Sequence, residues 1–306
     1  MNCFNGQEYL REAIDSVYCQ TYPDWEIIFF DNASTDRSAE IANSYDERLR
    51  YFRSERAIPL GSARNHALQK ASGGYIAFLD TDDVWLPAKL EKQVALMESN
   101  PTVGLVHSDV VNLNQREGER ISHFALLGHK PPRGRVFGYL LKFNALSMPS
   151  VMLRTMALRA QPEWFDERFE IYPDFDLFRR IAHDWGCDYV DEPLAIYRVH
   201  TASSSARKHD CAAQEIAQTI EKFLRLYPDI ERDHGAEINF LKAMIAYQRG
   251  KSYWRAGQAR DARKEFSRYL NVPKVATAYA ASFMPYPLVE RLWWAVRHVL
   301  NRHVRY

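Results

Sequence analysis

Three carboxylates stand within four residues at Asp80-Thr81-Asp82-Asp83, directly after the apolar run at residues 75–79. Gly73-Gly74 precede that run, and an apolar run bounded in this way is typical of a buried strand. Carboxylates this close together raise one another's pKa unless a cation lies among them. Mg²⁺ and Mn²⁺ prefer oxygen ligands and keep coordination positions open for phosphate oxygens. The stretch therefore predicts a metal-dependent enzyme that acts on a phosphorylated compound. An acidic turn before the helix near Leu86-Pro87 is the alternative.

The elements that must position these carboxylates alternate between helix and strand over the first two thirds of the chain. Apolar spacing predicts helices at residues 9–18, at 61–71 and from Pro87 onward. It predicts strands at residues 26–30, 49–52, 75–79, 103–111, 148–152 and 194–199. This alternation predicts a mostly parallel sheet with helices on both faces. Ligands of such sheets bind outside the carboxyl ends of the strands, so Asp31 and Asp80 are expected at one edge.

The sequence has too few residues for a full first strand before the first predicted helix. Met1-Asn2-Cys3-Phe4-Asn5-Gly6 comes immediately before the first predicted helix. A fold of this kind is expected to open with an apolar strand of several residues. We therefore expect Met1 to lie at the tip of that strand, through a late start codon or a truncation, with coding sequence rich in Val and Ile upstream.

Composition narrows the class of protein. The 306 residues are 46% hydrophobic and 13% aromatic, which fits one large domain and a smaller one. A net charge of +1 argues against a nucleic-acid binder, although residues 249–306 hold twelve Lys/Arg against three Asp/Glu. No run approaches the roughly 20 apolar residues that cross a bilayer. Four cysteines without paired or zinc-type spacing, and no secretory signal, predict reduced thiols in the cytoplasm: Cys3, Cys19, Cys187 and Cys211.

Five motifs occur in order along the first part of the chain. They are Asn5-Gly6-x-x-Tyr9-Leu10, Gln20-Thr21-Tyr22-x-x-Trp25-Glu26-Ile27-Ile28, Asp31-Asn32-Ala33-Ser34-Thr35-Asp36, Gly61-Ser62-Ala63-Arg64-Asn65 and Phe78-Leu79-Asp80-Thr81-Asp82-Asp83-x-Trp85. The set resembles family 2 glycosyltransferases of the GT-A fold, over residues 1–205. The resemblance implies an α/β domain that binds a nucleotide sugar, with a mixed, mostly parallel sheet flanked by helices.

The resemblance also implies roles for five residues in donor binding. Asp31 resembles the carboxylate that recognises the nucleotide base, and Arg64 the basic residue near the nucleotide. Asp80 is similar to the first aspartate of the family motif, which contacts ribose or metal, and Asp82 to the aspartate that binds Mn²⁺ or Mg²⁺. Asp83 is expected behind these groups or on the acceptor side, within the nucleotide-sugar site.

Two further positions complete the implied site. Asp174 resembles the family's catalytic base, which takes the proton from the acceptor hydroxyl; a helix cap is the alternative. Pro173 stands where the family usually has Glu. His200, in Tyr197-Arg198-Val199-His200, resembles a histidine that joins the aspartates around metal or diphosphate. Asn32 replaces an aspartate common in the family, and we assign it no catalytic role.

Residues 206–306 predict a helical appendage without a catalytic cluster. Gly250, Tyr253, Gly257, Ala262 and Phe266 match the spacing of one tetratricopeptide-like helical hairpin. The last predicted helix has a mixed surface. Its apolar residues are Leu288, Val289, Leu292, Trp293, Val296, Val299 and Leu300, accompanied by Trp294 and by Arg291, Arg297, Arg302 and Arg305. Such a helix suits packing in a core or peripheral contact with an anionic membrane.

The combined prediction is an inverting, metal-dependent glycosyltransferase with a catalytic domain at residues 1–205. It moves a sugar from a nucleotide-diphosphate donor to a glycan or lipid-linked acceptor, as in surface-polysaccharide assembly, in the cytoplasm or at the cytoplasmic face of the membrane. Two alternatives remain: a catalytically inactive domain that serves in assembly, and a nucleotidyltransferase. The second normally needs a Gly-rich phosphate loop near the N-terminus, and the sequence has none.

Overall fold

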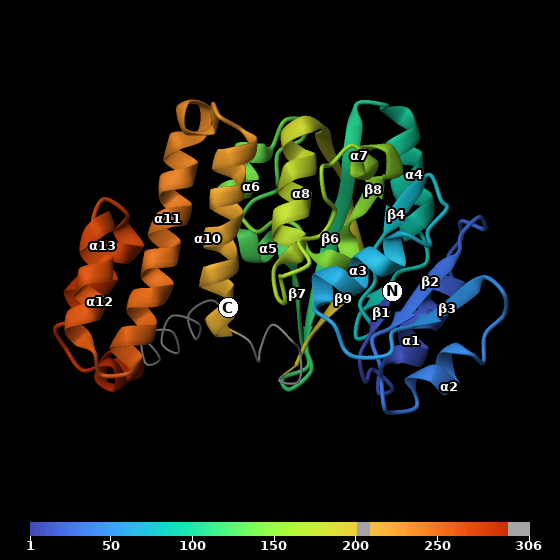
Figure 1. Cartoon of the computed structure of the whole chain (residues 1–306), viewed down its shortest axis with the longest axis horizontal. Coiled ribbons are helices and arrows are strands. Elements are labelled where there is room, and N and C mark those ends of the chain that lie inside the picture. The colour runs from blue at the N-terminus through green and yellow to red at the C-terminus, as the bar shows by residue number, and fades with distance from the viewer. Residues whose placement is uncertain (201–208, 293–306) are drawn as a thin grey trace, which may run out of the picture. The chain divides into compact units, whose positions relative to one another are not determined.

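The structure is a computed structural model that describes residues 1–200 and 209–292, with side chains of residues 209–212 left aside. The chain divides into two compact units, Met1–Ala212 and Ala213–Tyr306. The first unit is α/β and the second is helical (Figure 1). The predicted division at residue 205 lies among residues outside the described ranges and stays a prediction.

The first three strands of the α/β unit form a parallel sheet in the order β1-β2-β3. Helices connect these strands, as the alternation of apolar runs predicts. The elements are β1 (Asn2–Cys3), α1 (Leu10–Tyr18), β2 (Ile27–Asp31), α2 (Ser38–Ala42), β3 (Leu49–Arg53) and α3 (Leu60–Leu68). The predicted first strand is thus present as the two residues of β1, which pair with the end of β2.

The remaining strands form a second sheet in the order β4-β8-β6-β9-β5, with β7 on β6. Only β6 and β9 pair in parallel there; the other pairs are antiparallel. The sheet is therefore mixed, as expected, but parallel pairing predominates only in the first three strands. The strands are β4 (Tyr75–Ala77), β5 (Val84–Trp85), β6 (Val103–Asn114), β7 (Glu119–Ser122), β8 (Met152–Arg154) and β9 (Gly186–Val199). The helices between them are α4 (Lys89–Ser99), α5 (His123–Leu127), α6 (Phe137–Lys142), α7 (Thr155–Arg159) and α8 (Pro173–Asp184).

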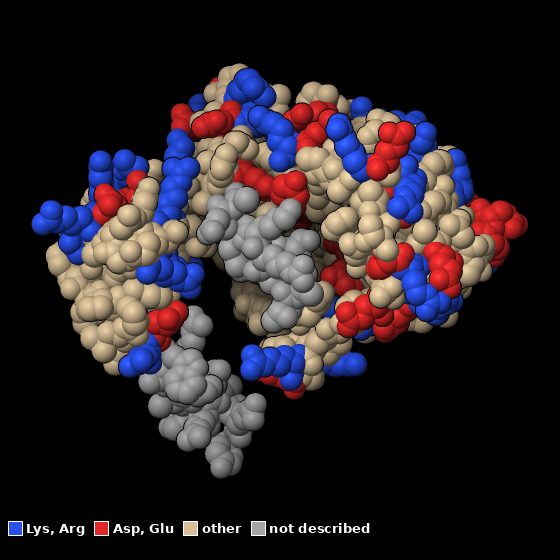
Figure 2. Space-filling model, turned by 60° about the horizontal axis from the view of Figure 1, so that its bottom comes forward, with Lys and Arg blue, Asp and Glu red and all other residues tan. Residues whose placement is uncertain are grey.

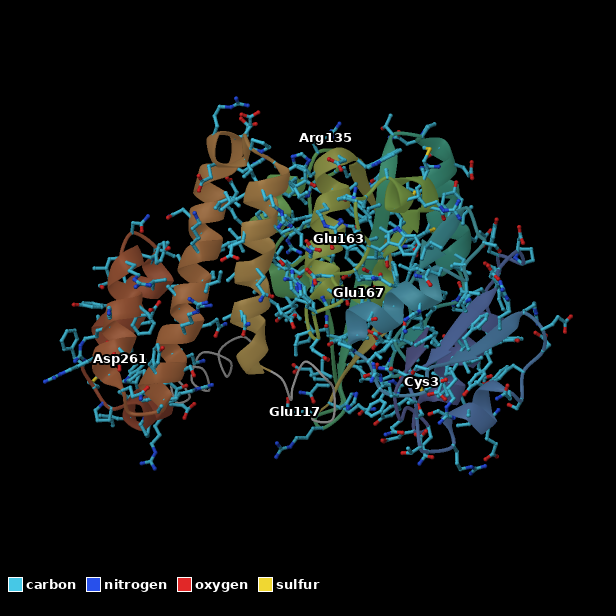
Figure 3. The ribbon with its side chains drawn as sticks, viewed as in Figure 1. Cys3, Glu117, Arg135, Glu163, Glu167 and Asp261 are labelled. Atoms are coloured by element: carbon cyan, nitrogen blue, oxygen red, sulfur yellow. The ribbon has the colours of Figure 1, made fainter. Side chains whose placement is uncertain are left out.

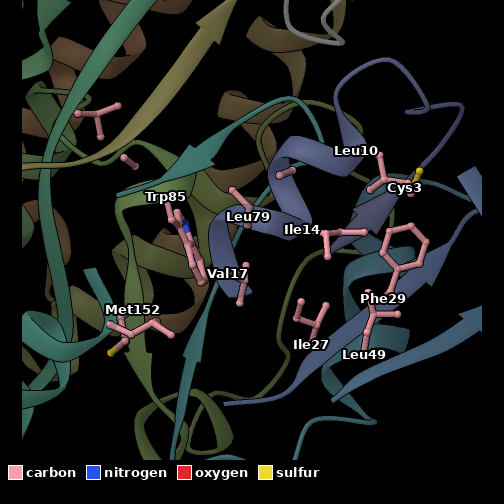
Figure 4. Close-up of a cluster of buried hydrophobic side chains, with 14 of the residues drawn as sticks. Cys3, Leu10, Ile14, Val17, Ile27, Phe29, Leu49, Leu79, Trp85 and Met152 are labelled. Carbon is pink, nitrogen blue, oxygen red and sulfur yellow. The ribbon is translucent and has the colours of Figure 1, made fainter. Parts of the chain in front are cut away.

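One side of α1 builds the core beneath the first sheet (Figure 4). Leu10, Ile14 and Val17 recur at helical spacing and are buried in one cluster with Phe29 of β2 and Trp85 of β5. Each fully buried side chain of this size contributes about 1.5–3 kcal/mol. This packing fixes α1 against strands from both sheets, and with it Tyr9 and Glu12, which face the candidate site.

The strand predicted at residues 148–152 is wrong in its first half. Residues Met148–Ser150 form a 3₁₀ turn (η1), and the strand β8 begins at Met152. Pro149 has no N–H to give to a ladder, while the Ser150 amide and hydroxyl both donate to the Ser147 carbonyl, at 2.9 and 2.6 Å. These bonds close a turn where the apolar pattern alone favours a strand.

A cavity of about 560 Å³ is lined by residues of β2 and β4. Its walls are mixed: Ile27 and Ile28 on one strand and residues 75–77 on the other are joined by Asp24 and Glu26. It follows the bodies of these strands, whereas the acidic residues stand at their carboxyl ends. The cavity is therefore distinct from the candidate site, although Arg64 borders it.

The second unit consists of helices. They are α10 (His209–Leu226), α11 (Ile230–Arg255), α12 (Ala259–Phe266), the 3₁₀ turn η2 (Ser267–Tyr269) and α13 (Pro273–Ala281), and residues 286–292 are helical as well. A β-carbon on Gly250 would lie 2.4 Å from the Phe266 ring, so only glycine allows α11 and α12 this close. Gly257 turns the chain between them with φ +78°. The residues singled out for a tetratricopeptide-like hairpin thus lie on one helical hairpin.

The terminal helix predicted from Leu288 onward is described only as far as Leu292; Trp293, Trp294 and the residues after them lie outside the described ranges. Within the described residues, none of the helices combines the length and apolar character that crossing a membrane requires.

Candidate active site

The acidic stretch forms a turn between β4 and β5. The amide of Asp83 donates to the carbonyl of Asp80 at 3.1 Å, which closes the turn. β5 then pairs antiparallel with β9, with Val84 opposite Ile196. This pairing brings the acidic turn beside the end of β9, where Arg198 and His200 stand. Residues more than a hundred positions apart are thereby joined into one site.

Asp82 and His200 are in direct contact. The Nε2 atom of His200 lies 3.0 Å from Oδ2 of Asp82, and both side chains are partly exposed. Burial, and next the charge of Asp80, raise the pKa of Asp82 above its ordinary value, while His200 acts in the opposite direction. The ring of Tyr9 packs against the imidazole, with 5.5 Å between centroids. An oxygen and a nitrogen donor therefore converge at this point of the site.

Asp83 lies behind this pair. Its side chain is 1% exposed, and its Oδ1 accepts a hydrogen bond from the amide of Arg198 at 2.9 Å. Among the described residues, no donor reaches its Oδ2. Burial, and then the charges of Asp82 and Asp80, raise the pKa of Asp83 well above its ordinary value. The structure thus gives Asp83 a contact with the backbone of β9; its assignment to the nucleotide-sugar site stays a prediction.

Arg64 forms an ion pair with Asp80. Its Nη2 lies 3.1 and 3.4 Å from the two carboxylate oxygens, and the guanidinium stands over the Phe165 ring at 5.4 Å. Arg64 is 6% exposed, whereas the carboxylate of Asp80 is 34% exposed. Asp80 therefore faces the site while Arg64 supports it from below, and both of these predicted donor-site residues are brought together.

The neighbours of Arg64 fix α3 to the segment between α7 and α8, where Figure 3 shows Glu163 and Glu167. Asn65 donates from its Nδ2 to the carbonyl of Phe165 at 2.9 Å and accepts from the amide of Phe165 at 3.0 Å. A β-carbon on Gly61 would lie 2.0 Å from the backbone oxygen of Asp166. Glycine and asparagine are therefore needed at these positions of the Gly61–Asn65 motif for close approach and for backbone pairing.

Asp174 lies in the first turn of α8, after Pro173. The N-cap position belongs to Tyr172, whose side chain makes no capping bond, so Asp174 is not the cap of this helix. Burial raises its pKa above the ordinary value; the charge of Arg64 acts against that shift, and the charge of Asp80 adds to it. These charge interactions place Asp174 in the electrostatic surroundings of the Arg64–Asp80 pair. A carboxyl with a raised pKa is suited to general-base chemistry near neutral pH.

Asp31 ends β2 and is fully buried. Its Oδ1 accepts from the Ser34 amide at 2.7 Å, and its Oδ2 accepts from the Tyr51 hydroxyl at 2.7 Å. Nη1 of Arg53 lies 3.6 Å from the same Oδ2. The carboxylate stands at the expected edge of the sheet, but every approach to it is filled by residues of the chain. Its predicted contact with a nucleotide base remains a prediction.

Asn32 holds the loop between β3 and α3. Its Nδ2 donates to the carbonyl of Ile58 at 2.8 Å, and its Oδ1 accepts from the amide of Ile58 at 3.0 Å. The hydroxyl of Ser54 donates to the same Oδ1 at 3.3 Å. These contacts account for Asn32 as a residue that holds the loop in place.

The donor set suits a hard divalent cation, although the protein supplies few ligands. Asp82 and His200 converge, and the charge of Asp80 adds to that of Asp82, which a cation would offset. No group of three or more His, Cys, Asp or Glu side chains able to hold a metal occurs within residues 1–200 and 209–292. Asp80 is not brought into one cluster with Asp82 and His200, because Arg64 engages it. Asp82 and His200 are therefore the residues that would hold Mn²⁺ or Mg²⁺, with phosphate oxygens and water as further ligands.

Two contributors to the site escaped the sequence argument. Arg198 stands over the Tyr9 ring at 5.0 Å and pairs with Glu12 of α1, at 2.5 Å. It thereby joins α1 to the end of β9. Tyr9 and Arg198 both belong to motifs in which other residues were assigned roles. Their places in the sequence, near Gly6 and His200, were the signal that could have indicated them.

Charged side chains of both signs lie on the face of the molecule that is in view in Figure 2. Figure 2 shows Lys, Arg, Asp and Glu side chains interspersed over the visible face. That distribution accords with the net charge of +1.

Solved structures identify the class of fold. The structure of S. aureus TarS 1–349 in complex with UDP-GlcNAc matches with a TM-score of 0.65 at 17% identity, covering 92% of this chain and 88% of that one. The mannosyltransferase PcManGT from Pyrobaculum calidifontis, in complex with GDP-Man and Mn²⁺, matches with a TM-score of 0.60 at 18% identity, covering 95% and 81%. These are GT-A glycosyltransferases, so the predicted GT-A fold is confirmed.

Sequence comparison gives the family. The family described as Glycosyl transferase family 2 matches residues 1–173. The putative teichuronic acid biosynthesis glycosyltransferase TuaG of Bacillus subtilis is 41% identical over 244 residues, covering 78% of this chain and 88% of TuaG. WfgD of Escherichia coli, a UDP-Glc:alpha-D-GlcNAc-diphosphoundecaprenol beta-1,3-glucosyltransferase, is 34% identical over 215 residues, covering 68% and 79%. The chain belongs to glycosyltransferase family 2 and is a glycosyltransferase, as the motifs predict.

Proposed function

We propose that this protein is an inverting, metal-dependent glycosyltransferase that moves a sugar from a nucleotide-diphosphate donor to a glycan or lipid-linked acceptor. The observation that supports this most directly is the contact between Asp82 and His200, with Asp80, the partner of Arg64, near enough for its charge to raise the pKa of Asp82. A nucleotidyltransferase is not favoured, because the family and the named relatives are glycosyltransferases.

Asp82 and His200 would hold the divalent cation, and Asp80 is near enough to raise the pKa of Asp82 through its charge. A bound Mn²⁺ or Mg²⁺ supplies positive charge to the leaving diphosphate. The protein itself keeps the cation's surroundings negative and partly buried. Arg64 orients the carboxylate of Asp80, which we assign to the ribose of the donor or to the metal.

Asp174 accepts the proton of the acceptor hydroxyl as its oxygen attacks the anomeric carbon. The bond from that carbon to the diphosphate breaks on the opposite side, so configuration inverts. The raised pKa of Asp174 increases its strength as a base, and Arg64 keeps enough of it ionised near neutral pH. A single carboxylate at this position matches a one-step displacement, which needs one base and no second nucleophile on the protein.

The acceptor and pathway follow from the relatives by analogy. TuaG is named for teichuronic acid biosynthesis, and WfgD acts on a diphosphoundecaprenol-linked sugar. We assign this protein to surface-polysaccharide assembly in the cytoplasm, at the cytoplasmic face of the membrane. Phe283, Leu288 and Leu292 are exposed beside Arg291, which suits peripheral contact with anionic lipid. A chain ending at Pro285 should then pellet less with anionic liposomes than the full chain does; equal pelleting would refute the membrane contact.

The activity is tested with a panel of sugar nucleotides and Mn²⁺, by detecting released nucleoside diphosphate. We expect one donor to be hydrolysed or transferred, and chelation of the metal to abolish turnover. Asp82→Ala should remove metal-dependent turnover, whereas Asp261→Asn, an exposed carboxylate of α12, should behave as the unaltered protein does. The configuration of the product at its anomeric carbon, measured by NMR, shows whether the transfer inverts. Turnover that survives both chelation and Asp82→Ala would refute metal dependence.

A further inference from the structure

The ring of Tyr9 lies against two side chains at the end of β9. The Arg198 guanidinium stands 5.0 Å from the centroid of this ring, and the centroid of the His200 imidazole lies 5.5 Å from it, with 52° between the two ring planes. Side chains two positions apart along an extended strand point to the same side, and Val199 between these residues is exposed. Arg198 and His200 therefore share Tyr9 as a neighbour.

Tyr9 is itself fixed by contacts with other segments. Its hydroxyl donates to Oε1 of Gln115 at 3.0 Å, and the amide of Gln115 donates to the carbonyl of Val199 at 3.3 Å. Gln115 directly follows β6, so these contacts join the β6–β7 hairpin to the end of β9. The Tyr9 amide donates to the Gly6 carbonyl at 3.2 Å, at the residue that precedes α1. The ring is thus held by the start of α1, by the hairpin and by Arg198.

The contact between His200 and Asp82 restrains one atom of the imidazole. Nε2 lies 3.0 Å from Oδ2 of Asp82, and a ring held at one atom can still turn about that contact. Packing against Tyr9 restrains the plane of the ring as well, at a centroid distance within the range of about 4.5–7 Å that aromatic pairs prefer. A histidine binds a metal more tightly when neighbouring groups hold its ring in the orientation that the metal requires.

We propose that Tyr9 is a positioning residue for cation binding: its ring, held by Gln115 and Arg198, keeps the His200 imidazole directed toward Asp82, where the divalent cation would bind. This inference rests on the proposed metal-dependent function and adds a residue at the start of α1 to the site. In this role Tyr9 acts through His200 and makes no bond to the cation itself.

Tyr18 provides a matched control at the other end of α1. Like Tyr9 it is half-buried, and its hydroxyl donates to a side-chain oxygen, Oδ1 of Asp46, at 2.6 Å. Its ring packs against two other aromatic rings, at centroid distances of 4.9 and 5.1 Å. Removing either tyrosine therefore takes a comparable set of contacts away from this helix, but the ring of Tyr9 is the one that packs on His200.

The test is a titration of the full chain with Mn²⁺, in which electron paramagnetic resonance measures the free ion. Tyr9→Ala should weaken Mn²⁺ binding by about 3- to 10-fold, because it frees the imidazole without deleting it. Tyr9→Phe keeps the ring and its contact with Arg198, so its affinity should stay within about twofold of that of the unaltered protein. Tyr18→Ala should leave the affinity unchanged. Urea unfolding shows whether each variant is folded.

A double-mutant cycle distinguishes positioning from general damage to the site. When Tyr9→Ala is introduced into the His200→Ala protein, Mn²⁺ binding should weaken by less than about twofold further, since the residue through which Tyr9 acts is already gone. A structural role independent of His200 would give the same loss in both backgrounds. If Tyr9→Ala does not fold, Tyr9→Leu, which keeps an apolar side chain, takes its place in the cycle.

Several results would overturn the inference. An unchanged Mn²⁺ affinity in folded Tyr9→Ala would mean that His200 needs no support from the ring, and an equal loss in Tyr9→Phe would assign the effect to the hydroxyl. An equal loss with and without His200 would mean that Tyr9 acts by another route. An equal loss in Tyr18→Ala would mean that any damage to α1 weakens the site. If the unaltered protein binds no Mn²⁺, the metal dependence in the proposed function fails, and the inference falls with it.

Discussion

Oδ1 of Asp83 accepts a hydrogen bond from the backbone amide of Arg198 at 2.9 Å, across 115 residues of chain. Asp83 follows Asp82 directly, and Arg198 is two residues before His200. The bond therefore joins the two strand ends that carry the metal-binding pair. It explains why a third acidic residue follows Asp82, although its own carboxyl is nearly inaccessible.

Two substitutions of Asp83 should distinguish the effect of losing its charge from the effect of losing its hydrogen bond with the Arg198 amide. Because its pKa is raised well above the ordinary value, we expect Asp83→Asn, which keeps an oxygen acceptor, to retain most of the stability. Asp83→Ala leaves the Arg198 amide buried without a partner, at a cost of about 1–3 kcal/mol. Urea unfolding and Mn²⁺ binding should both weaken in the Ala variant. If the Asn and Ala variants are equally impaired, the charge of Asp83 is what matters and this explanation is wrong.

His200 should contribute to cation affinity. It lies 3.0 Å from Asp82, so His200→Ala removes both a nitrogen donor and the group that orients the carboxylate. We expect Mn²⁺ affinity to fall about 10- to 100-fold, as when a ligand's support is removed. The measurement is electron paramagnetic resonance of free Mn²⁺ during titration. His66→Ala, which alters an exposed histidine of α3, is the control; equal affinities in the two variants would exclude His200 from the site.

Gly61 should tolerate no side chain. A β-carbon there meets the Asp166 carbonyl at 2.0 Å, and backbone cannot swing aside as a side chain does. Gly61→Ala is therefore expected to destabilise the protein by about 1–3 kcal/mol, despite the higher helix propensity of alanine. Gly74→Ala is the control, because a β-carbon at that position would have no neighbour within 4 Å. Equal urea midpoints for the two variants would show that α3 and the loop are not held this closely.

Asp174→Asn should remove the base but not the donor site. We expect kcat to fall about 10²- to 10⁴-fold with little change in KM for the donor. In the unaltered protein, activity should be lost as pH falls through the pKa of Asp174, at a higher pH than an ordinary carboxyl would give, because burial raises that pKa. A pH–rate profile whose acid limb persists unchanged in Asp174→Asn would assign the base elsewhere.

The sequence predicted the edges of the site better than its interior. The strand end expected at Asp31 is observed, because β2 ends at that residue. The strand predicted at residues 75–79 is shorter than expected: β4 ends at Ala77, and Asp80 follows it in the turn toward β5. Apolar periodicity carries no information on which carboxylate is buried, so the enclosure of Asp31 by Tyr51 and Arg53 was not foreseen. The turn at Met148–Ser150 was missed because hydrogen bonds from the Ser150 amide and hydroxyl to the Ser147 carbonyl override the apolar pattern. Contacts between distant segments, such as Asn65 with Phe165, are set by tertiary packing alone.

Lys89 offers a pH-dependent test of the core. Its ammonium is fully buried, donates to Gln93 at 2.6 Å and stands over the Trp85 ring at 4.3 Å. Burial lowers its pKa from 10.5 to about 7. Between these values the unfolded chain holds a proton that the folded protein lacks, so stability rises with pH. Below pH 7 both states are protonated, and the full penalty of burying the charge is present.

We therefore expect the free energy of unfolding to rise between pH 7 and pH 9.5 in the unaltered protein by more than in Lys89→Met. The difference in slope isolates Lys89, since every other titrating group is common to both. Urea unfolding at several pH values measures it. Lys92→Met, which removes an exposed lysine one turn along the same helix, should keep the slope of the unaltered protein. If Lys89→Met keeps that slope as well, the ammonium of Lys89 is hydrated in the folded state and its pKa is ordinary.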